Sequence, residues 1–240
     1  KFSHQQLSFW SGIVFSAVYV VAALVSPIWG KLADKKGRKP MILRASLGMA
    51  VVFTCMGLAQ NVWQLLFLRG MQGVFAGFIS NSNALIAAET PKNKAGKALG
   101  IMSSATTGGQ LLGPFAGGAL SQAFSYRVTF FITGTLLFIC FVLSVFFIHE
   151  DDFVPVKNGQ RGNFKETVKE FKSGQLIIGL LLTTLIIQAA NNSINPIVSL
   201  YVRSLMHNSG QVVFASGVIA ALPGIATVAA ASYFGGLGDR

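Results

Sequence analysis

Long apolar runs separated by short polar turns make up most of the chain. We expect helices over these seven runs: 9–29, 41–59, 63–88, 98–121, 128–148, 175–202 and 211–234. A helix needs about 20 apolar residues to cross a bilayer core of roughly 30 Å, and each run is close to that length or longer. Membrane barrel strands would instead be short and alternating. The pattern therefore predicts an all-α membrane protein with about seven transmembrane helices.

Basic residues gather in every second connection. Of the 19 lysines and arginines, fifteen fall on one side of the predicted membrane and three on the other, while Arg69 lies inside a run. The fifteen are Lys31, Lys35, Lys36, Arg38, Lys39, Arg44, Lys92, Lys94, Lys97, Lys157, Arg161, Lys165, Lys169, Lys172 and Arg240. Cytoplasmic loops carry such an excess, so we expect a multi-pass protein of the plasma or inner membrane with this side in the cytoplasm.

A polar stretch, residues 150–174, and an internal repeat divide the chain. A shift of 205 residues lays Ser11-Gly12-Ile13 on Ser216-Gly217-Val218 and Asp34 on Asp239. Five runs precede the polar stretch and two follow it. We therefore expect two pseudo-symmetric six-helix halves, with one further span before Lys1 and four after Arg240. The predicted parts are an N-terminal helical half (1–149), a cytoplasmic central loop (150–174) and the start of a second half (175–240).

Composition narrows the classes of function. The chain is 52% hydrophobic and only 11% charged, whereas soluble domains carry about a quarter charged residues. The net charge is +11, but the basic residues lie between apolar runs rather than on one solvated face. Nucleic acid is therefore not an expected partner. Cys55 and Cys140 lack the spacing of a metal site. No nucleophile–base pair or phosphate loop appears, and we expect no catalytic residues, no metal and no enzyme.

The first basic turn, residues 30–40, places an acid in an unfavourable position. Asp34 lies near the C-terminal end of its predicted helix, where exposed carbonyls disfavour an anion. Arg38 and Lys35 are the nearest candidates to compensate its charge. The alternative is that the turn is a solvated topology signal and nothing more.

Arg69 is the one formal charge buried in a predicted span, since Arg44, near the start of the run 41–59, is counted with the basic turn. An arginine at depth costs some 2.5–3.5 kcal/mol on insertion scales, which argues for a function. On a continuous helix its face would also carry these residues: Gln72, Gly73, Ala76, Ser80 and Asn83. We expect this stripe to line a water-accessible cavity. The alternative is a structural arginine satisfied by backbone carbonyls.

The run 98–121 contains a ladder of small residues. The ladder consists of Ala105, Gly109, Gly113 and Gly117. Small residues at this spacing let a neighbouring helix approach closely, and Pro114 is expected to bend the helix. Ordinary helix packing would produce the same close contact.

The run 175–202 offers amides at helical spacing. Gln188, Asn191, Asn192 and Asn195 share one face, and Pro196 is expected to break the helix directly after them. Neutral amides suit varied ligands, so these residues, with Asn83, are candidates for a substrate cavity. The alternative is that they bond neighbouring helices together.

Three spaced motifs resemble the major facilitator superfamily. They are Gly30-x-Leu32-Ala33-Asp34-Lys35-x-Gly37-Arg38-Lys39, Arg69-x-x-Gln72-Gly73, and Gly109-x-x-x-Gly113-Pro114-x-x-Gly117-Gly118. The first resembles the superfamily's loop motif, the second its fourth-span motif, and the third the motif of its antiporters. The chain as a whole is similar to spans two to eight of twelve in the bacterial drug:proton antiporter branch.

The resemblance implies functions that the pattern alone does not give. It implies the major facilitator fold, a first loop that latches the two halves together, and a role for Arg69 in proton relay. The repeat places a second latch at Gly235, Leu237, Asp239 and Arg240.

The activity implied is export of lipophilic, often cationic compounds in exchange for protons by alternating access. The proton gradient would supply the energy, with no cofactor and with a monomer in the bilayer. No Asp or Glu lies deep in a span, and Glu89 comes nearest. The alternatives are a transporter of one metabolite and a nontransporting scaffold or receptor.

Overall fold

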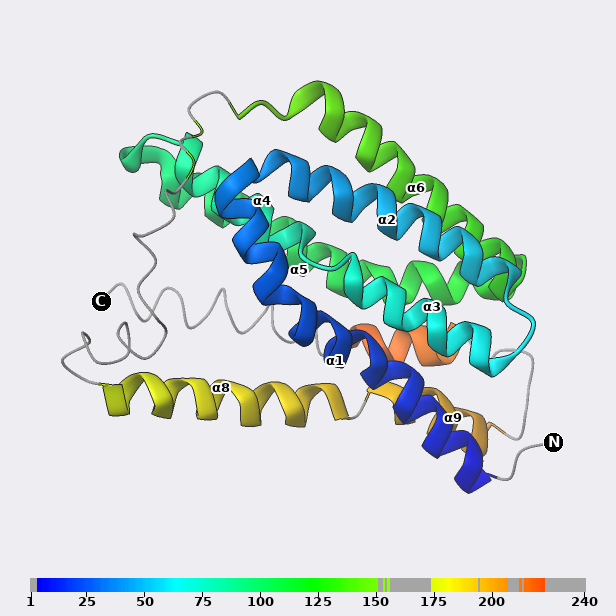
Figure 1. Ribbon diagram of the computed structural model, residues 1–240. Coiled ribbons are helices and arrows are strands. Elements are labelled where there is room, and N and C mark those ends of the chain that lie inside the picture. Colours follow the sequence, from blue (N-terminus) through cyan, green and yellow to red (C-terminus); the bar gives the residue numbers. More distant parts are fainter. Residues whose placement is uncertain are drawn as a thin grey trace.

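The computed structural model describes residues 4–150, 153, 155, 174–193, 195–206, 212 and 214–222. Within these ranges the chain is helical and contains no strand, as predicted (Figure 1). The helices are α1 (His4–Lys36), α2 (Lys39–Leu58), α3 (Val62–Val74), α4 (Phe78–Glu89), α5 (Lys92–Ala123), α6 (Tyr126–Phe147), α8 (Gly174–Ser193) and α9 (Asn195–Leu205).

Four described stretches are long and apolar enough to cross a membrane. They are Phe9–Lys36, Lys39–Leu58, Val62–Glu89 and Tyr126–Phe147. Helix α5 is longer than the predicted run 98–121 but is diluted by glycine, serine and threonine, and it is not among the four. It begins at Lys92, so the lysines expected in a loop lie in its first turns.

Helix α2 forms the centre of the described bundle. It lies between α6 and α3 and packs most extensively on α6 (Figure 1). Half of its apolar window is buried, whereas none of the corresponding window of α1 is. Gly134 of α6 allows the close approach, because a Cβ there would overlap the Thr54 hydroxyl and lie 3.1 Å from the Ala50 carbonyl oxygen. The core of the bundle therefore runs along α2.

The basic turn is tighter than the sequence predicted. Helix α1 continues to Lys36 and α2 starts at Lys39, so only Gly37 and Arg38 separate them. Gly37 has φ 94°, a left-handed conformation that side chains disfavour. Most of the basic residues of the turn thus lie on helix ends.

The predicted continuous span 63–88 is wrong in its middle. Helix α3 ends at Val74 and α4 begins at Phe78, and Gly77 between them has φ 108°. We call Phe75–Gly77 the α3–α4 break. It interrupts a 28-residue apolar stretch, Val62–Glu89, near its midpoint.

The second half of the chain is described in part. The predicted span 175–202 is given as two helices, α8 and α9, and Pro196 is the second residue of α9, where a missing N–H costs little. Of the predicted span 211–234, residue 212 and residues 214–222 are described as helical. Most of the predicted central loop lies outside the described residues, and the proposed division into parts stays a prediction.

Candidate functional site

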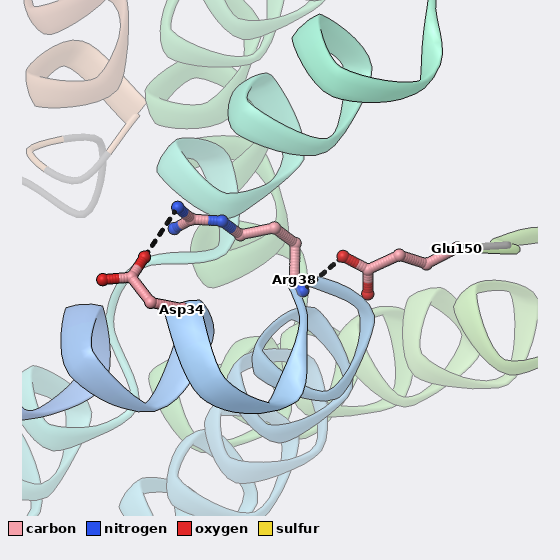
Figure 2. Close-up of polar contacts among 3 residues, drawn as sticks. All are labelled: Asp34, Arg38 and Glu150. Atoms are coloured by element: carbon pink, nitrogen blue, oxygen red, sulfur yellow. Dashed lines mark hydrogen bonds and ion pairs between the residues drawn. The ribbon is translucent and has the colours of Figure 1, made fainter. Parts of the chain in front are cut away.

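The α1–α2 turn holds the expected ion pair. Nη2 of Arg38 lies 3.3 Å from Oδ1 of Asp34, so Arg38 is one of the two cations predicted to compensate this acid (Figure 2). The side chains are 33% and 35% exposed. Water therefore screens the pair. The pair contributes only about 0.3–0.5 kcal/mol to stability, as exposed i,i+4 pairs do. A contact this weak can exchange partners readily.

Glu150, which follows the end of α6, binds the same turn. Its carboxylate accepts the backbone N–H groups of Arg38 at 2.7 Å and Lys39 at 2.8 Å (Figure 2 shows the acid reaching Arg38). These N–H groups begin α2, where free donors and the helix dipole favour an anion. A Cβ on Gly37 would lie 2.5 Å from Oε2 of Glu150. Sequence analysis placed Glu150 in the central loop and missed this contact.

A small polar cavity of about 180 Å³ lies beside the turn. It is lined by Ala22, Ser26, Trp29, Gly30, Arg38, Gly73, Ala76, Gly77, Ser80 and Asn81. The indole N–H of Trp29 is buried without a hydrogen-bond partner. The cavity therefore joins the end of α1, the α3–α4 break and the Asp34–Arg38 turn in one polar space.

Arg69 pairs with the other polar residue of its motif. Nη1 of Arg69 donates to Oε1 of Gln72 at 3.1 Å, one turn further along α3. Its Nε is buried without a partner. Gly73, next in the motif, lets α1 approach so closely that a Cβ would overlap the carbonyl of Val18. The motif thus places a charged, partly satisfied guanidinium at the packed α1–α3 contact.

The single polar stripe predicted from Arg69 onward does not hold along its whole length. The α3–α4 break interrupts its helix, and Gly73, Ala76 and Ser80 line the cavity beside the turn. Asn83 instead lines a second cavity of about 650 Å³ between α4 and α5. That cavity is lined by Ile79, Asn83, Ala84, Leu99, Ser103, Thr106, Thr107 and Gln110. The candidate substrate residue therefore faces hydroxyls and an amide of α5.

Arg44 is a functional candidate that the sequence analysis missed. It was counted with the basic turn, yet it lies in α2 and donates to the carbonyls of Val74 at 3.3 Å and Ala76 at 2.8 Å. Its guanidinium carbon is 3.7 Å from the centre of the Trp29 ring. The available signal was an arginine placed inside the apolar run 41–59.

The described part of the chain shows one close contact of the antiporter-like motif, at Pro114 and Gly118. Gly109, Gly113 and Gly117 have no described atom within 4 Å of an added Cβ, so the close contact expected at these three stays a prediction. A Cβ on Gly217, however, would lie 2.5 Å from the Pro114 carbonyl oxygen and 3.2 Å from the Gly118 Cα. Helix α5 continues through Pro114 without a break.

The remaining candidates are described less fully. Gln188 is an exposed residue of α8. The backbone of Asn191, Asn192 and Asn195 is helical, but their side chains lie outside the description. The second-half latch residues Gly235, Leu237, Asp239 and Arg240 lie outside the described residues. In the described part of the chain, no group of three His, Cys, Asp or Glu side chains could hold a metal ion.

Comparisons with known proteins place these features in a family. The model of the Major Facilitator Superfamily matches residues 2–240. Proteins named "Multidrug resistance protein MdtG" from Salmonella dublin, Salmonella arizonae and Salmonella paratyphi B are each 50% identical to the chain over 237 residues. The match covers 99% of this chain and 58% of each relative.

Proposed function

Because the chain belongs to the Major Facilitator Superfamily, we propose that it is part of a transporter that exports lipophilic, often cationic compounds in exchange for protons. One observation carries the proposal. The chain is 50% identical, over nearly its whole length, to relatives named for multidrug resistance. Residues that the resemblance assigned to transport also lie around polar cavities in an otherwise apolar bundle. The plasma or inner membrane is the proposed location, and a monomer the proposed state.

The α4–α5 cavity is the proposed place for part of the substrate. Its volume of about 650 Å³ falls within the range of small-molecule sites, roughly 300–1,000 Å³. Its polar lining is neutral: Asn83, Ser103, Thr106, Thr107 and Gln110. Neutral donors and acceptors accommodate different ligands without selecting one charge. Gln188, Asn191, Asn192 and Asn195 remain proposed contributors from the second half.

The α1–α2 turn is the proposed latch between access states. Its Asp34–Arg38 pair is half-exposed and weak, so either member can re-pair at small cost when the halves move. The internal repeat places Asp239 at the equivalent position in the second half. Gly217 packs on Pro114 and Gly118, which supports a contact between the two halves along α5.

Arg69 is the proposed relay residue. Its guanidinium is half satisfied by Gln72, and its Nε keeps a free donor. Arg69→Lys separates the two roles considered for it. A lysine preserves the charge, so a relay survives, whereas a forked hydrogen-bonding role is lost.

Reconstitution of the full-length transporter tests the proposal. A lipophilic cationic dye should leave proteoliposomes when a pH gradient is imposed, and adding the dye alone should drive protons the other way. A nigericin-treated sample, in which the gradient is dissipated, is the control. Dye movement that ignores the gradient would indicate a facilitator of the same fold, and no movement of any solute would indicate a scaffold.

A further inference from the structure

The α3–α4 break leaves backbone carbonyls at the end of α3 without partners in their own helix. The last carbonyls of a helix have no partner within that helix. In water such groups are hydrated, but inside an apolar stretch every one needs a donor from the protein. The break lies in the apolar stretch Val62–Glu89, so the carbonyls at the end of α3 require a donor there.

Arg44 supplies that donor from another helix. One guanidinium reaches two carbonyls, those of Val74 and Ala76, through separate nitrogens. The planar fork of arginine suits two acceptors at once, and a cation at a helix C-terminus is favoured by the dipole. The guanidinium carbon also lies over the Trp29 ring, at a distance typical of a cation–π contact. Arg44 therefore ties α1 and α2 to the end of α3.

Other contacts show that the break is specifically built. The ring of Phe75 packs against Gly48, one turn beyond Arg44, so tightly that a Cβ on Gly48 would overlap it. On the far side, the Gly77 carbonyl accepts Nδ2 of Asn81 at 2.7 Å and Oγ of Ser80 at 3.1 Å. The groups on both sides of the break are thus bonded in a fixed arrangement.

The break also separates two sets of polar residues. Arg69 and Gln72 are on α3, whereas Asn83 lies on α4 and lines the cavity against α5. On one continuous helix these residues would share a face. The break therefore separates Asn83 and its cavity from the Arg69–Gln72 pair.

We propose that Arg44 is a positioning residue of the transport cycle, whose guanidinium holds the α3–α4 break and thereby fixes the orientation of α4 relative to α3. This inference rests on the proposed function for its link to transport. Its structural part, the control of α4 by Arg44, stands independently and can be measured without any transport.

Cysteine labelling measures the orientation of α4 directly. The full-length protein is freed of Cys55 and Cys140 by serine substitution, and Ala84→Cys is placed in the α4–α5 cavity. A matched reporter, Ala59→Cys, lies in a separate cavity beside the ends of α2 and α6. The rate of reaction with a water-soluble maleimide is measured in membranes. Arg44→Gln should change the rate at residue 84 by about tenfold, the size expected from losing hydrogen bonds to a charged group, and leave residue 59 within about twofold.

Two further variants guard against simple unfolding. Arg44→Lys keeps the charge but not the fork, so it should give a smaller shift at residue 84 in the same direction. Lys36→Gln removes an exposed lysine at the end of α1 that lines neither reporter cavity, and it should leave both reporters unchanged. Rates at residue 84 that ignore Arg44→Gln and Arg44→Lys would overturn the proposal, as would equal changes at residues 84 and 59.

Transport kinetics link the break to function. If α4 presents the substrate cavity, Arg44→Lys should raise the KM for dye at least as much as it lowers the maximal rate, while expression is unchanged. A labelling shift with unchanged transport kinetics would overturn the positioning role in the cycle. A parent protein that moves no solute but still shows the labelling shift would contradict the proposed function and leave the control of α4 by Arg44 in place.

Discussion

At both the α1–α2 turn and the α3–α4 break, a charged side chain bonds backbone groups at a helix end. The turn joins two helix ends, whereas the break interrupts an apolar stretch. Each contains a glycine with positive φ, Gly37 at 94° and Gly77 at 108°. At the turn, the carboxylate of Glu150 accepts N–H groups that begin α2, and at the break the guanidinium of Arg44 donates to carbonyls that end α3. Each charge has the sign that its helix end favours.

The two sites differ in how readily water can replace a lost hydrogen-bond partner. The turn lies at a helix end with half-exposed side chains, so water can take over from a lost partner. The break lies within an apolar stretch and borders a polar cavity of about 180 Å³, so less water is available there to replace a lost donor. A lost charged partner should therefore cost less stability at the turn than at the break. Stability measurements on the detergent-solubilised full-length protein can test this contrast.

Arg44→Met should have the largest effect. It removes both donors to Val74 and Ala76 and the contact with Trp29 while keeping an apolar chain. We expect a loss of about 3 kcal/mol in unfolding free energy, the scale of hydrogen bonds to a charged group. Thermal unfolding followed by tryptophan fluorescence measures it, with Arg127→Met as the matched control. A loss no greater than that of the control would refute the contrast.

Gly77→Ala should have the next largest effect. A side chain in the left-handed region costs about 1–2 kcal/mol, and the added Cβ would lie 3.3 Å from Nδ2 of Asn81. Gly12→Ala is the matched control, since no described atom lies within 4 Å of its added Cβ. Equal unfolding temperatures for the two variants would show that the break does not require its positive φ.

Glu150→Gln should lower the unfolding free energy less, by about 0.5–1 kcal/mol. The amide oxygen can still accept one N–H group, and water can bond the other. The loss should shrink as salt is raised, since the missing charge acts on an accessible helix end. Unfolding at low and high ionic strength checks this. A loss equal to that of Arg44→Met would erase the distinction between the two sites.

Asp34→Asn should have the smallest effect on stability and a large one on transport. The exposed i,i+4 pair contributes about 0.3–0.5 kcal/mol. If the turn is the latch, dye efflux should nevertheless be abolished while membrane insertion stays intact. Efflux equal to that of the parent would remove the latch from the proposal.

The turn could be predicted from the sequence because its signals are local. Apolar runs on both sides, the basic residues and Gly37 all lie within a short stretch, and Asp34 and Arg38 are four residues apart. Helical spacing alone brings such a pair together. The helical class followed in the same way, from the lengths of the apolar runs.

The break could not be predicted, because groups that bond it lie elsewhere in the chain. Arg44 is 30 and 32 residues from the carbonyls that it binds, and Glu150 is more than a hundred residues from the N–H groups that it caps. Hydrophobic periodicity over residues 63–88 is compatible with one continuous helix, and it correctly gave Arg69 and Gln72 but misplaced Asn83.

A double-mutant cycle between Arg44 and Gly77 tests the central claim most directly. Arg44 lies in α2 and Gly77 in the break, where an added Cβ would lie 3.9 Å from Nη2 of Arg44. If both residues act only through the break, their substitutions should not add. We predict that Arg44→Met with Gly77→Ala unfolds at nearly the same free energy as Arg44→Met alone. Losses that add fully would contradict the claim that Arg44 acts by holding the break.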